Sequence, residues 1–291
     1  MSEVVFVMGA TGNIGREVVR QLAEAGRPVR AGVRKPAAAA ALHGANIEIV
    51  QADYDRPGHI AAALAGCDAL FVVNGLSPAM GEQCRILADA ARDAGVGRIV
   101  RASMMSAEVA EPILVARWHR AAERAIEAAG VPFTHLRPNT FMQNFSNMHA
   151  ESIRRTNSFF GPLGEGRTSY VDVRDIAAAA VAVLTQAGHE NKSYTLTGGE
   201  ALSAFDIALL LSGALGRRIT YVETPAAAAR RALDEVGATP VMADALMQLF
   251  AAMKDGACAA VVADLERLLG RPPISFAQFA KDHARVFELI V

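Results

Sequence analysis

The sequence predicts an α/β fold built on a doubly wound parallel sheet. Short β-branched runs alternate with alanine-rich amphipathic stretches through the first half of the chain, which is the pattern of strand–helix–strand units. Some runs, such as residues 69–73, are apolar throughout, and this is typical of strands buried on both faces of a sheet. With 52% hydrophobic residues among 291, the chain has enough apolar material for a large core.

The expected elements follow one another in chain order. Strands are expected over residues 4–8, 29–33, 47–51, 69–73, 98–102 and 133–136. Helices are expected over residues 14–25 and 80–94 and from about Pro112 to Ala129. Each of these helices is followed by a glycine (Gly26, Gly95 or Gly130), the residue that most readily adopts the left-handed conformation at a helix C-terminus.

The alternation stops after Pro138. Residues 139–166 are rich in Asn, Phe, Met and Gly, and we expect helical and loop segments outside the sheet there. A short strand is expected over 169–173, with Asp175 as the N-cap of a helix to about Leu184. The remaining pattern predicts a strand over 193–196, a helix opened by Ser203 with Asp206 three residues on, a strand over 219–222, and then several helices.

Charge and cysteine content exclude several classes of protein. The 29 basic and 30 acidic side chains leave a formal charge of -1, without the basic excess of nucleic-acid or membrane-surface proteins. Three scattered cysteines are too few for a disulfide framework or a metal site. No secretory signal is apparent, and the apolar stretch 176–184 is far shorter than the roughly 20 residues that span a bilayer. We expect a cytoplasmic monomer or homodimer with no metal, nucleic-acid or membrane partner.

The most specific motif is a glycine-rich turn between the first strand and the first helix. Its residues are Gly9, Ala10, Thr11, Gly12, Asn13, Ile14 and Gly15. In such a turn, free backbone N–H groups and the positive end of the helix bind phosphates, and the glycines let a pyrophosphate approach the backbone. The turn therefore predicts a dinucleotide site, and the alternative is a turn that is glycine-rich for steric reasons alone.

The residues after the second strand discriminate between the two nicotinamide cofactors. An acidic residue there would bind the ribose 2′-hydroxyl of NAD, but this chain has Arg34 and Lys35. Because a guanidinium pairs well with a 2′-phosphate, we expect NADPH; an ordinary solvated loop is the alternative for both residues. Asp53, after the third strand, is a candidate contact near the adenine or a turn cap.

Several further segments extend the pattern along most of the chain. They are residues 33–34, 66–68, 91–96, His119 with Glu123, 132–137, 173–177 and 188–194. Together with the glycine turn, and in this order, they resemble the NmrA-like atypical short-chain dehydrogenase/reductases, in the branch of the triphenylmethane reductases and type 2 NADPH:quinone oxidoreductases. The resemblance implies a Rossmann-type sheet with a smaller, mostly C-terminal substrate lobe.

The same resemblance implies the domain boundaries and further cofactor contacts. Residues 1–138 would form an NADP-binding Rossmann domain and 139–291 a substrate lobe, with 168–198 returning to the Rossmann sheet. The contacts, besides the glycine turn and Arg34, would follow the fourth, fifth and sixth strands: Val73, Asn74, Gly75, Ser103, Arg137, Pro138 and Asn139.

The chain departs from ordinary short-chain dehydrogenases at their catalytic pair. Those enzymes use Tyr-x-x-x-Lys, in which the lysine lowers the pKa of the tyrosine, but no tyrosine here is followed by a lysine four residues later. His119 stands in place of the lysine and Val115 in place of the tyrosine. His119 is therefore the candidate catalytic residue, in a positioning role. It would contact the nicotinamide ribose or act as an acid, since an imidazole titrates near neutrality; a structural role is the alternative.

Without that pair, the expected activity is NADPH-dependent hydride transfer to an acceptor that needs little proton donation. Planar, electron-poor compounds fit: quinones, azo or triphenylmethane dyes, and iminium compounds. Methionine and phenylalanine form deformable apolar pockets that suit planar aromatic ligands. The candidate pocket residues are Ser77, Met104, Met105, Phe141, Met142 and Phe145; ordinary core packing is the alternative, most strongly for Met105.

A second function stays open beside the reductase. Some NmrA-like proteins bind NADP without turnover, so a non-catalytic, redox-sensing regulator is the alternative. The sequence shows no DNA-binding segment, and its near-zero charge does not predict a nucleic-acid surface. We therefore favour the reductase.

Overall fold

A computed structural model of the protein describes residues 3–39, 42–108 and 112–288. The chain forms two compact units, each assembled from segments that are distant in sequence. Unit 1 comprises Met1–Pro112, Ala116–Pro138 and Val173–Thr195, and unit 2 comprises Ile113–Val115, Asn139–Asp172 and Leu196–Val291.

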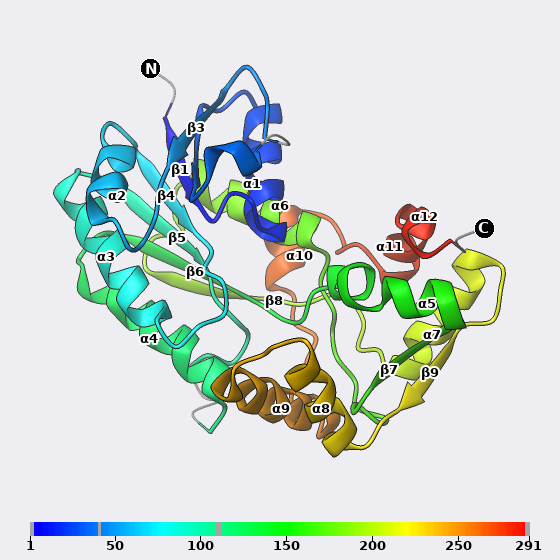
Figure 1. Ribbon diagram of the computed structural model, residues 1–291. Coiled ribbons are helices and arrows are strands. Elements are labelled where there is room, and N and C mark those ends of the chain that lie inside the picture. The colour runs from blue at the N-terminus through cyan, green and yellow to red at the C-terminus, as the bar shows by residue number, and fades with distance from the viewer. Residues whose placement is uncertain (1–2, 40–41, 109–111, 289–291) are drawn as a thin grey trace. The chain divides into compact units, whose positions relative to one another are not determined.

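Among the described residues, unit 1 is built around a seven-stranded sheet (Figure 1). Its strands are β1 (Val5–Met8), β2 (Val29–Val33), β3 (Ile47–Gln51), β4 (Ala69–Val72), β5 (Arg98–Ala102), β6 (Phe133–Pro138) and β8 (Lys192–Leu196). The spatial order is β3-β2-β1-β4-β5-β6-β8, and the five pairs from β3 to β6 are all parallel. The predicted fold class, a doubly wound parallel sheet, is confirmed.

Helices cover both faces of this sheet (Figure 1). On one face lie α1 (Asn13–Glu24) and α6 (Val173–Thr185); on the other lie α2 (Pro57–Leu64), α3 (Met80–Asp93) and α4 (Leu114–Ala128). The side-chain amide of Gln21 on α1 donates a hydrogen bond to the carbonyl of Arg174 at 2.9 Å. The first helix of the unit is thus tied to a segment that follows 153 residues later. Every residue of β1 and β4 is buried, as expected for inner strands covered on both faces.

Unit 2 combines a small parallel pair of strands with helices. The strands are β7 (Ser158–Gly161) and β9 (Thr220–Glu223). The helices are α5 (Ala150–Thr156), α7 (Ala204–Leu215), α8 (Ala226–Glu235), α9 (Pro240–Lys254), α10 (Asp264–Leu269), α11 (Phe276–Asp282) and α12 (Ala284–Phe287), with a π-helical turn η2 (Phe145–His149) before α5. The ring of Phe145 packs edge-on against Phe159, Tyr170 and Phe276, with centroids 5.1 to 5.6 Å apart. These rings form the aromatic core of the unit.

Two local predictions were wrong. The expected strand 169–173 is absent; Thr168 and Val171 only form isolated bridges, with Leu202 and Phe141. This segment is extended, but α6 begins at Val173 and leaves no length for a ladder. Asp175 consequently lies in the first turn of α6 and is not its N-cap.

One predicted helix cap is confirmed, and the structure contains further short elements. Ser203 caps α7 reciprocally with Asp206, as predicted from their spacing. The alanine-rich stretch after β2 forms a short 3₁₀ turn, η1 (Pro36–Ala39). The structure adds two elements that were not predicted, α2 and β7.

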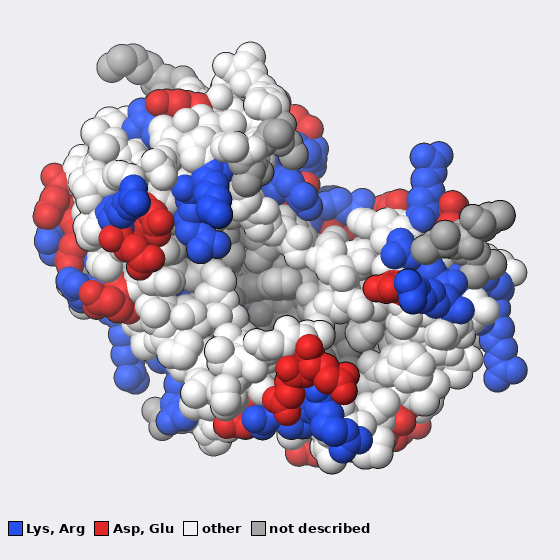
Figure 2. Space-filling model, in the orientation of Figure 1, with Lys and Arg blue, Asp and Glu red and all other residues white. Residues whose placement is uncertain are grey.

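The surface carries closely mixed charge. On the face shown in Figure 2, Lys and Arg side chains are interspersed with Asp and Glu. On α3 the mixing comes from ion pairs about one turn apart, in which Arg85 contacts both Glu82 and Asp89. No helix in the described part of the chain combines the length and the apolar character that crossing a membrane requires.

Candidate cofactor and active site

The predicted cofactor residues of unit 1 follow the carboxyl ends of neighbouring strands. They are Gly9 after β1, Arg34 after β2, Asp53 just beyond β3, Val73 after β4, Ser103 after β5, and Arg137 and Pro138 at the end of β6. Because these strands are parallel neighbours, their carboxyl ends share one edge of the sheet. The strand order reverses between β1 and β4, and α/β proteins bind ligands at such a switch point. Asn139, also predicted, belongs to unit 2.

The three glycines of the turn have different reasons to be glycine. Gly9 has a φ of +85°, and a Cβ there would collide with the carbonyl oxygen of Val73. A Cβ on Gly15 would collide with the carbonyl oxygen of Gly9. At Gly12, however, the nearest atom to an added Cβ is that same carbonyl oxygen at 3.5 Å, an ordinary contact. The packing of the chain therefore requires Gly9 and Gly15, but it does not require Gly12.

The space beside Gly12 lies at the start of α1. Gly12 is the N-cap of this helix, no side chain caps it, and the first turn carries no acidic residue. The N–H groups of a first helical turn have no partner within the helix, and the helix dipole makes this end positive. The residues present therefore fit a phosphate group in the space that a Cβ on Gly12 would fill.

The loops after β2 and β3 carry the candidate adenosine contacts. Arg34 and Lys35 are both exposed, and the side-chain amide of Gln51 donates to the carbonyl of Arg34 at 3.2 Å. The backbone of Arg34 is thus tied to β3. The carboxylate of Asp53 accepts the N–H of Asp55 at 3.2 Å, so Asp53 caps a turn, which is the alternative that its position allowed.

Asn74, after β4, is held by three side chains. Its amide nitrogen donates to the hydroxyl of Tyr54 at 2.8 Å and to Oε1 of Gln83 at 3.1 Å, and its oxygen accepts from the thiol of Cys84 at 3.2 Å. Burial raises the pKa of Tyr54 and of Cys84, so both keep their protons at neutral pH. Tyr54 follows Asp53 just beyond β3, and its contact with Asn74 was not predicted from the sequence.

The candidate catalytic residue, His119 on α4, contacts a buried arginine. Nη2 of Arg101 on β5 lies 3.3 Å from Nδ1 of His119, and the side chain of Arg101 has no exposed surface. Burial, reinforced by the positive charge of Arg101, lowers the pKa of His119 well below 6.5. His119 therefore does not titrate near neutrality. Sequence reasoning also missed Arg101, whose signal is a lone charge within the apolar run 99–102.

The guanidinium of Arg137 is occupied by two carboxylates. It binds the fully buried Glu123 of α4 at two points, each 2.9 Å long, and it also pairs with Glu108 in the loop after β5. Any contact of Arg137 with a cofactor would therefore come from its backbone. The ion pair fixes the end of β6 against α4, one helical turn beyond His119.

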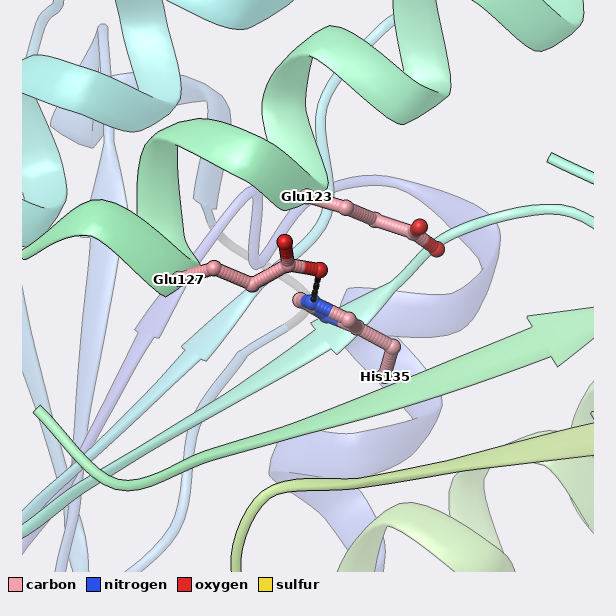
Figure 3. Close-up of side chains that lie close together, drawn as sticks. All are labelled: Glu123, Glu127 and His135. Atoms are coloured by element: carbon pink, nitrogen blue, oxygen red, sulfur yellow. Dashed lines mark ion pairs between the residues drawn. The ribbon is translucent and has the colours of Figure 1, made fainter. Parts of the chain in front are cut away.

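Glu123, Glu127 and His135 form the metal-like cluster shown in Figure 3, with Glu127 Oε1 3.3 Å from His135 Nε2. Their ligand atoms lie within 4.8 Å of one another. However, Arg120 contacts Glu127 at 2.5 Å and Glu123 at 3.1 Å, and Arg137 binds Glu123 as well. A divalent cation would have to displace these arginines. We interpret the cluster as an ion-pair network.

The predicted acceptor residues divide by burial. Met105, Met142 and Phe145 are buried, with exposures of 7%, 1% and 5%, and Phe145 belongs to the aromatic core of unit 2. The other three are partly exposed: Ser77, Met104 and Phe141. The Ser77 hydroxyl accepts the N–H of Ala79 at 3.1 Å, just before α3 begins.

A cavity that the sequence did not indicate lies within unit 2. It has a volume of about 400 Å³, and its lining consists of Pro162, Glu223, Thr224, Pro225, Ala226, Met247, Phe250, Ala251 and Lys254. None of the predicted acceptor residues lines it. Lys254 and Glu223 form an ion pair of 2.7 Å in its wall.

The parallel sheet, its switch point and the glycine turn together define an α/β protein of the dinucleotide-binding class. The model of the NmrA-like family matches residues 1–264. The chain belongs to the NmrA-like family, and the family predicted from the sequence is confirmed.

The similarity to several characterised proteins covers nearly the whole chain. An NAD(P)H azoreductase of Xenophilus azovorans is 39% identical, covering 98% of this chain and 99% of its own. A crystal structure of the NADPH-dependent quinone oxidoreductase of Escherichia coli with NADPH is 29% identical, with a TM-score of 0.85 and coverages of 96% and 99%. The triphenylmethane reductase of Citrobacter sp. with NADP(H) is 26% identical, with a TM-score of 0.84 and the same coverages. The cofactors of both solved relatives agree with the NADPH prediction.

Proposed function

We propose that the protein is an NADPH-dependent reductase of planar, electron-poor organic compounds: quinones, azo or triphenylmethane dyes, or iminium compounds. The observation that carries the proposal is the space at Gly12. Gly9 and Gly15 are required by the chain, whereas Gly12 leaves an open position at an uncapped helix N-terminus. A pyrophosphate is the group that such a position accommodates.

Arg34 supports NADPH over NADH. It is exposed directly after β2, where an acidic residue would otherwise bind the ribose of NAD. Its guanidinium offers paired donors to a 2′-phosphate, with Lys35 adjacent. The pyrophosphate would contact the turn from Gly9 to Gly15, and the backbone after β4, β5 and β6 would line the nicotinamide end.

The chemistry at that end requires little from acid–base groups. When bound, NADPH supplies a hydride from its nicotinamide ring. No tyrosine in the sequence is followed by a lysine four residues later, and burial keeps His119 neutral. The residues therefore act by binding and orienting an acceptor whose reduction does not depend on an enzymic acid. Quinones and cationic or azo dyes meet that condition, and the named reductases among the relatives act on these classes by their names.

The proposed acceptor contacts are those predicted side chains that remain partly exposed, each taken within its own unit. Phe141, Met104 and Ser77 have surface available for contact. Met105, Met142 and Phe145 are buried, so we do not propose that they touch the acceptor. Apolar and aromatic side chains with available surface, such as Met104 and Phe141, favour planar aromatic ligands.

The test is a panel of acceptors at fixed NADPH concentration. A soluble quinone, an azo dye and a triphenylmethane dye are each added to the purified protein, and NADPH oxidation is followed by its absorbance, with acceptor-free and enzyme-free controls. We expect turnover with at least one of the three. Tight NADPH binding without turnover on any acceptor would support the redox-sensing regulator. Absence of NADPH binding would refute the cofactor assignment itself.

A further inference from the structure

Arg101 is a buried cation with no direct ion pair among the described residues, although its charge acts on the nearby carboxylate of Glu123. Its side chain has no exposed surface, and within the described ranges no acidic group forms an ion pair with it. Its Nε and Nη1 atoms have no hydrogen-bond partner among the described residues. Its Nη2 lies 3.3 Å from Nδ1 of His119, and the guanidinium also forms a hydrogen bond with the side chain of Cys84. Buried charges are ordinarily paired, so this arrangement calls for a reason other than stability.

The contact has only one chemically consistent form. A guanidinium carries five donors and no acceptor, and it does not lose its proton in proteins. Nδ1 of His119 must therefore be the acceptor, which leaves the single ring proton of a neutral imidazole on Nε2. Arg101 thus selects both the charge state and the tautomer of His119.

We propose that Arg101 is a positioning residue that holds His119 neutral, with its proton on Nε2, so that His119 serves as a fixed hydrogen-bond donor at the carboxyl edge of the sheet and not as a general acid. The donor would face an oxygen of the bound cofactor or of the acceptor. This part of the inference rests on the proposed reductase function, whereas the protonation of His119 does not. In the reduction of a quinone to a hydroquinone, one hydride comes from NADPH and one proton is required. With His119 fixed in this way, that proton comes from water.

The other titratable groups around the Arg101–His119 pair do not favour a proton on Nδ1 of His119. From β6, His135 is neutral at physiological pH, because burial lowers its pKa to about 4. From α3 and the loop after β3, Cys84 and Tyr54 keep their protons because burial raises their pKa values. Glu123, one turn beyond His119 on α4, is hydrogen-bonded by Arg137 and Arg120, and it also interacts electrostatically with Arg101. Burial is the larger cause of the lowered pKa of His119, and the charge of Arg101 adds to it.

The test reads the histidine directly. The full-length protein is labelled with ¹⁵N-histidine, and the signals of His119 are identified by their loss in His119→Gln. In the wild type we expect Nε2 protonated and Nδ1 bare from about pH 5 to about pH 8, with no titration. In Arg101→Met the pKa of His119 should rise above its wild-type value, and both tautomers should be populated. Met is apolar and of similar length, and replacing a buried unpaired charge by an apolar residue is often tolerated.

Two further variants separate charge from shape. Arg101→Lys keeps a donor and a charge, so His119 should retain its bare Nδ1. Arg101→Gln keeps an N–H donor without the charge, so the tautomer should persist while the pKa rises. His189, whose Nδ1 lies 2.8 Å from the hydroxyl of Tyr194, is an internal control that none of these changes should move. A wild-type His119 that titrates near 6.5, or that is unchanged in Arg101→Met, would overturn the proposal.

Turnover provides the second readout. With an acceptor from the panel, kcat/KM of the wild type should be flat from about pH 6 to about pH 8, and Arg101→Met should acquire a new limb at the risen pKa of His119. A wild-type limb that is abolished by His119→Gln would contradict the proposal. The labelling experiment needs neither NADPH nor an acceptor, so failure of the reductase function and failure of this inference are distinguishable.

Discussion

Arg137 and Glu123 form a two-point ion pair in the interior of unit 1, with Nε–Oε1 and Nη2–Oε2 both 2.9 Å. Both groups are deeply buried. The pair joins the last strand before the chain enters unit 2 to the helix that carries His119. Replacing one of the two residues by an uncharged one would leave the charge of the other uncompensated in the interior.

We therefore expect Glu123→Gln to lower the free energy of unfolding by about 3 to 5 kcal/mol, the usual cost of breaking a buried pair by removing one partner. Urea unfolding followed by circular dichroism measures this. The matched control is Glu82→Gln, which removes a carboxylate paired with Arg85 on the exposed face of α3. That variant should unfold nearly as the wild type does. Equal effects of the two substitutions would contradict our assignment of the buried pair.

Arg34→Ala should discriminate between the two cofactors. A charge-assisted contact with the 2′-phosphate is worth about 1.5 to 3 kcal/mol, so NADPH should bind roughly 10- to 150-fold more weakly, while NADH is nearly unaffected. Fluorescence titration of both cofactors measures the difference. Arg124→Ala, an exposed arginine on α4, is the control and should change neither affinity. Parallel losses for NADPH and NADH in Arg34→Ala would refute this role.

Gly12→Ala tests the open position in the turn. An added Cβ meets no atom of the chain closer than 3.5 Å, so the fold should tolerate it, with a thermal midpoint close to that of the wild type. The methyl group fills the space assigned to the pyrophosphate, and NADPH affinity should fall by about tenfold or more, which is roughly 1.4 kcal/mol. Gly213→Ala, inside α7 with open space around it, is the control and should bind NADPH normally while gaining up to about 1 kcal/mol in stability. Unaltered NADPH binding by Gly12→Ala would rule out this cradle.

His119→Ala should slow the enzyme without inactivating it. A donor that only orients its partner contributes about tenfold to kcat and a rise in the KM for NADPH, or roughly 1.4 kcal/mol. A general acid would contribute about 10²- to 10⁴-fold. Steady-state kinetics with the best acceptor of the panel measure this, with His43→Ala at an exposed position as the control. A loss beyond about a thousandfold would exclude positioning, and no loss at all would make His119 structural.

The free energy of unfolding should fall in mild acid, because a buried neutral histidine takes up a proton when unfolding exposes it to water. Burial lowers the pKa of His135 in the folded state from 6.5 to about 4, so the unfolded chain binds the proton first. The contribution of His135 to the free energy of unfolding is therefore fully present above about pH 6.5. It declines as the pH falls to about 4, by on the order of 3 kcal/mol for this one residue. Urea unfolding at a series of pH values measures the slope. His135→Gln, which cannot titrate, should have a shallower acid slope; an identical slope would show that other groups govern acid unfolding.

Much of the sheet was predictable because its signals are local. Apolar runs bounded by turns define β1 to β6, and the glycine turn ties the first strand to α1. The elements that were missed had no such signal. Pro57 and Gly58 open α2 with the two poorest helix formers, although proline is well tolerated at a helix start. β7 pairs with β9 about sixty residues later, and a pairing between such distant segments leaves no local pattern.

The candidate site divides in the same way. The glycines and Arg34 could be proposed from the sequence because their neighbours in the chain indicate the roles assigned to them. Arg101 and Tyr54 depend on contacts between separate elements: Arg101 with His119 across β5 and α4, and Tyr54 with Asn74 across two loops. Arg137 was predicted from its position, but its guanidinium is occupied by Glu123 and Glu108. Only folding in three dimensions shows which side chains are already engaged.

The interleaved order of the two units constrains how the chain is made. A ribosome releases the chain from its N-terminus, at about 5 to 20 residues per second in general. Strands β1 to β6 thus emerge before 139–172, and α6 and β8 emerge only afterwards. Until then the nascent sheet has an unpaired edge at β6, and α1 lacks its neighbour α6; such an edge is open to wrong pairing. A fragment that ends at Pro138 would keep this exposed edge permanently. Unit 1 therefore cannot be isolated by cutting the chain once, because its sheet is completed only when residues 173–195 have been synthesised.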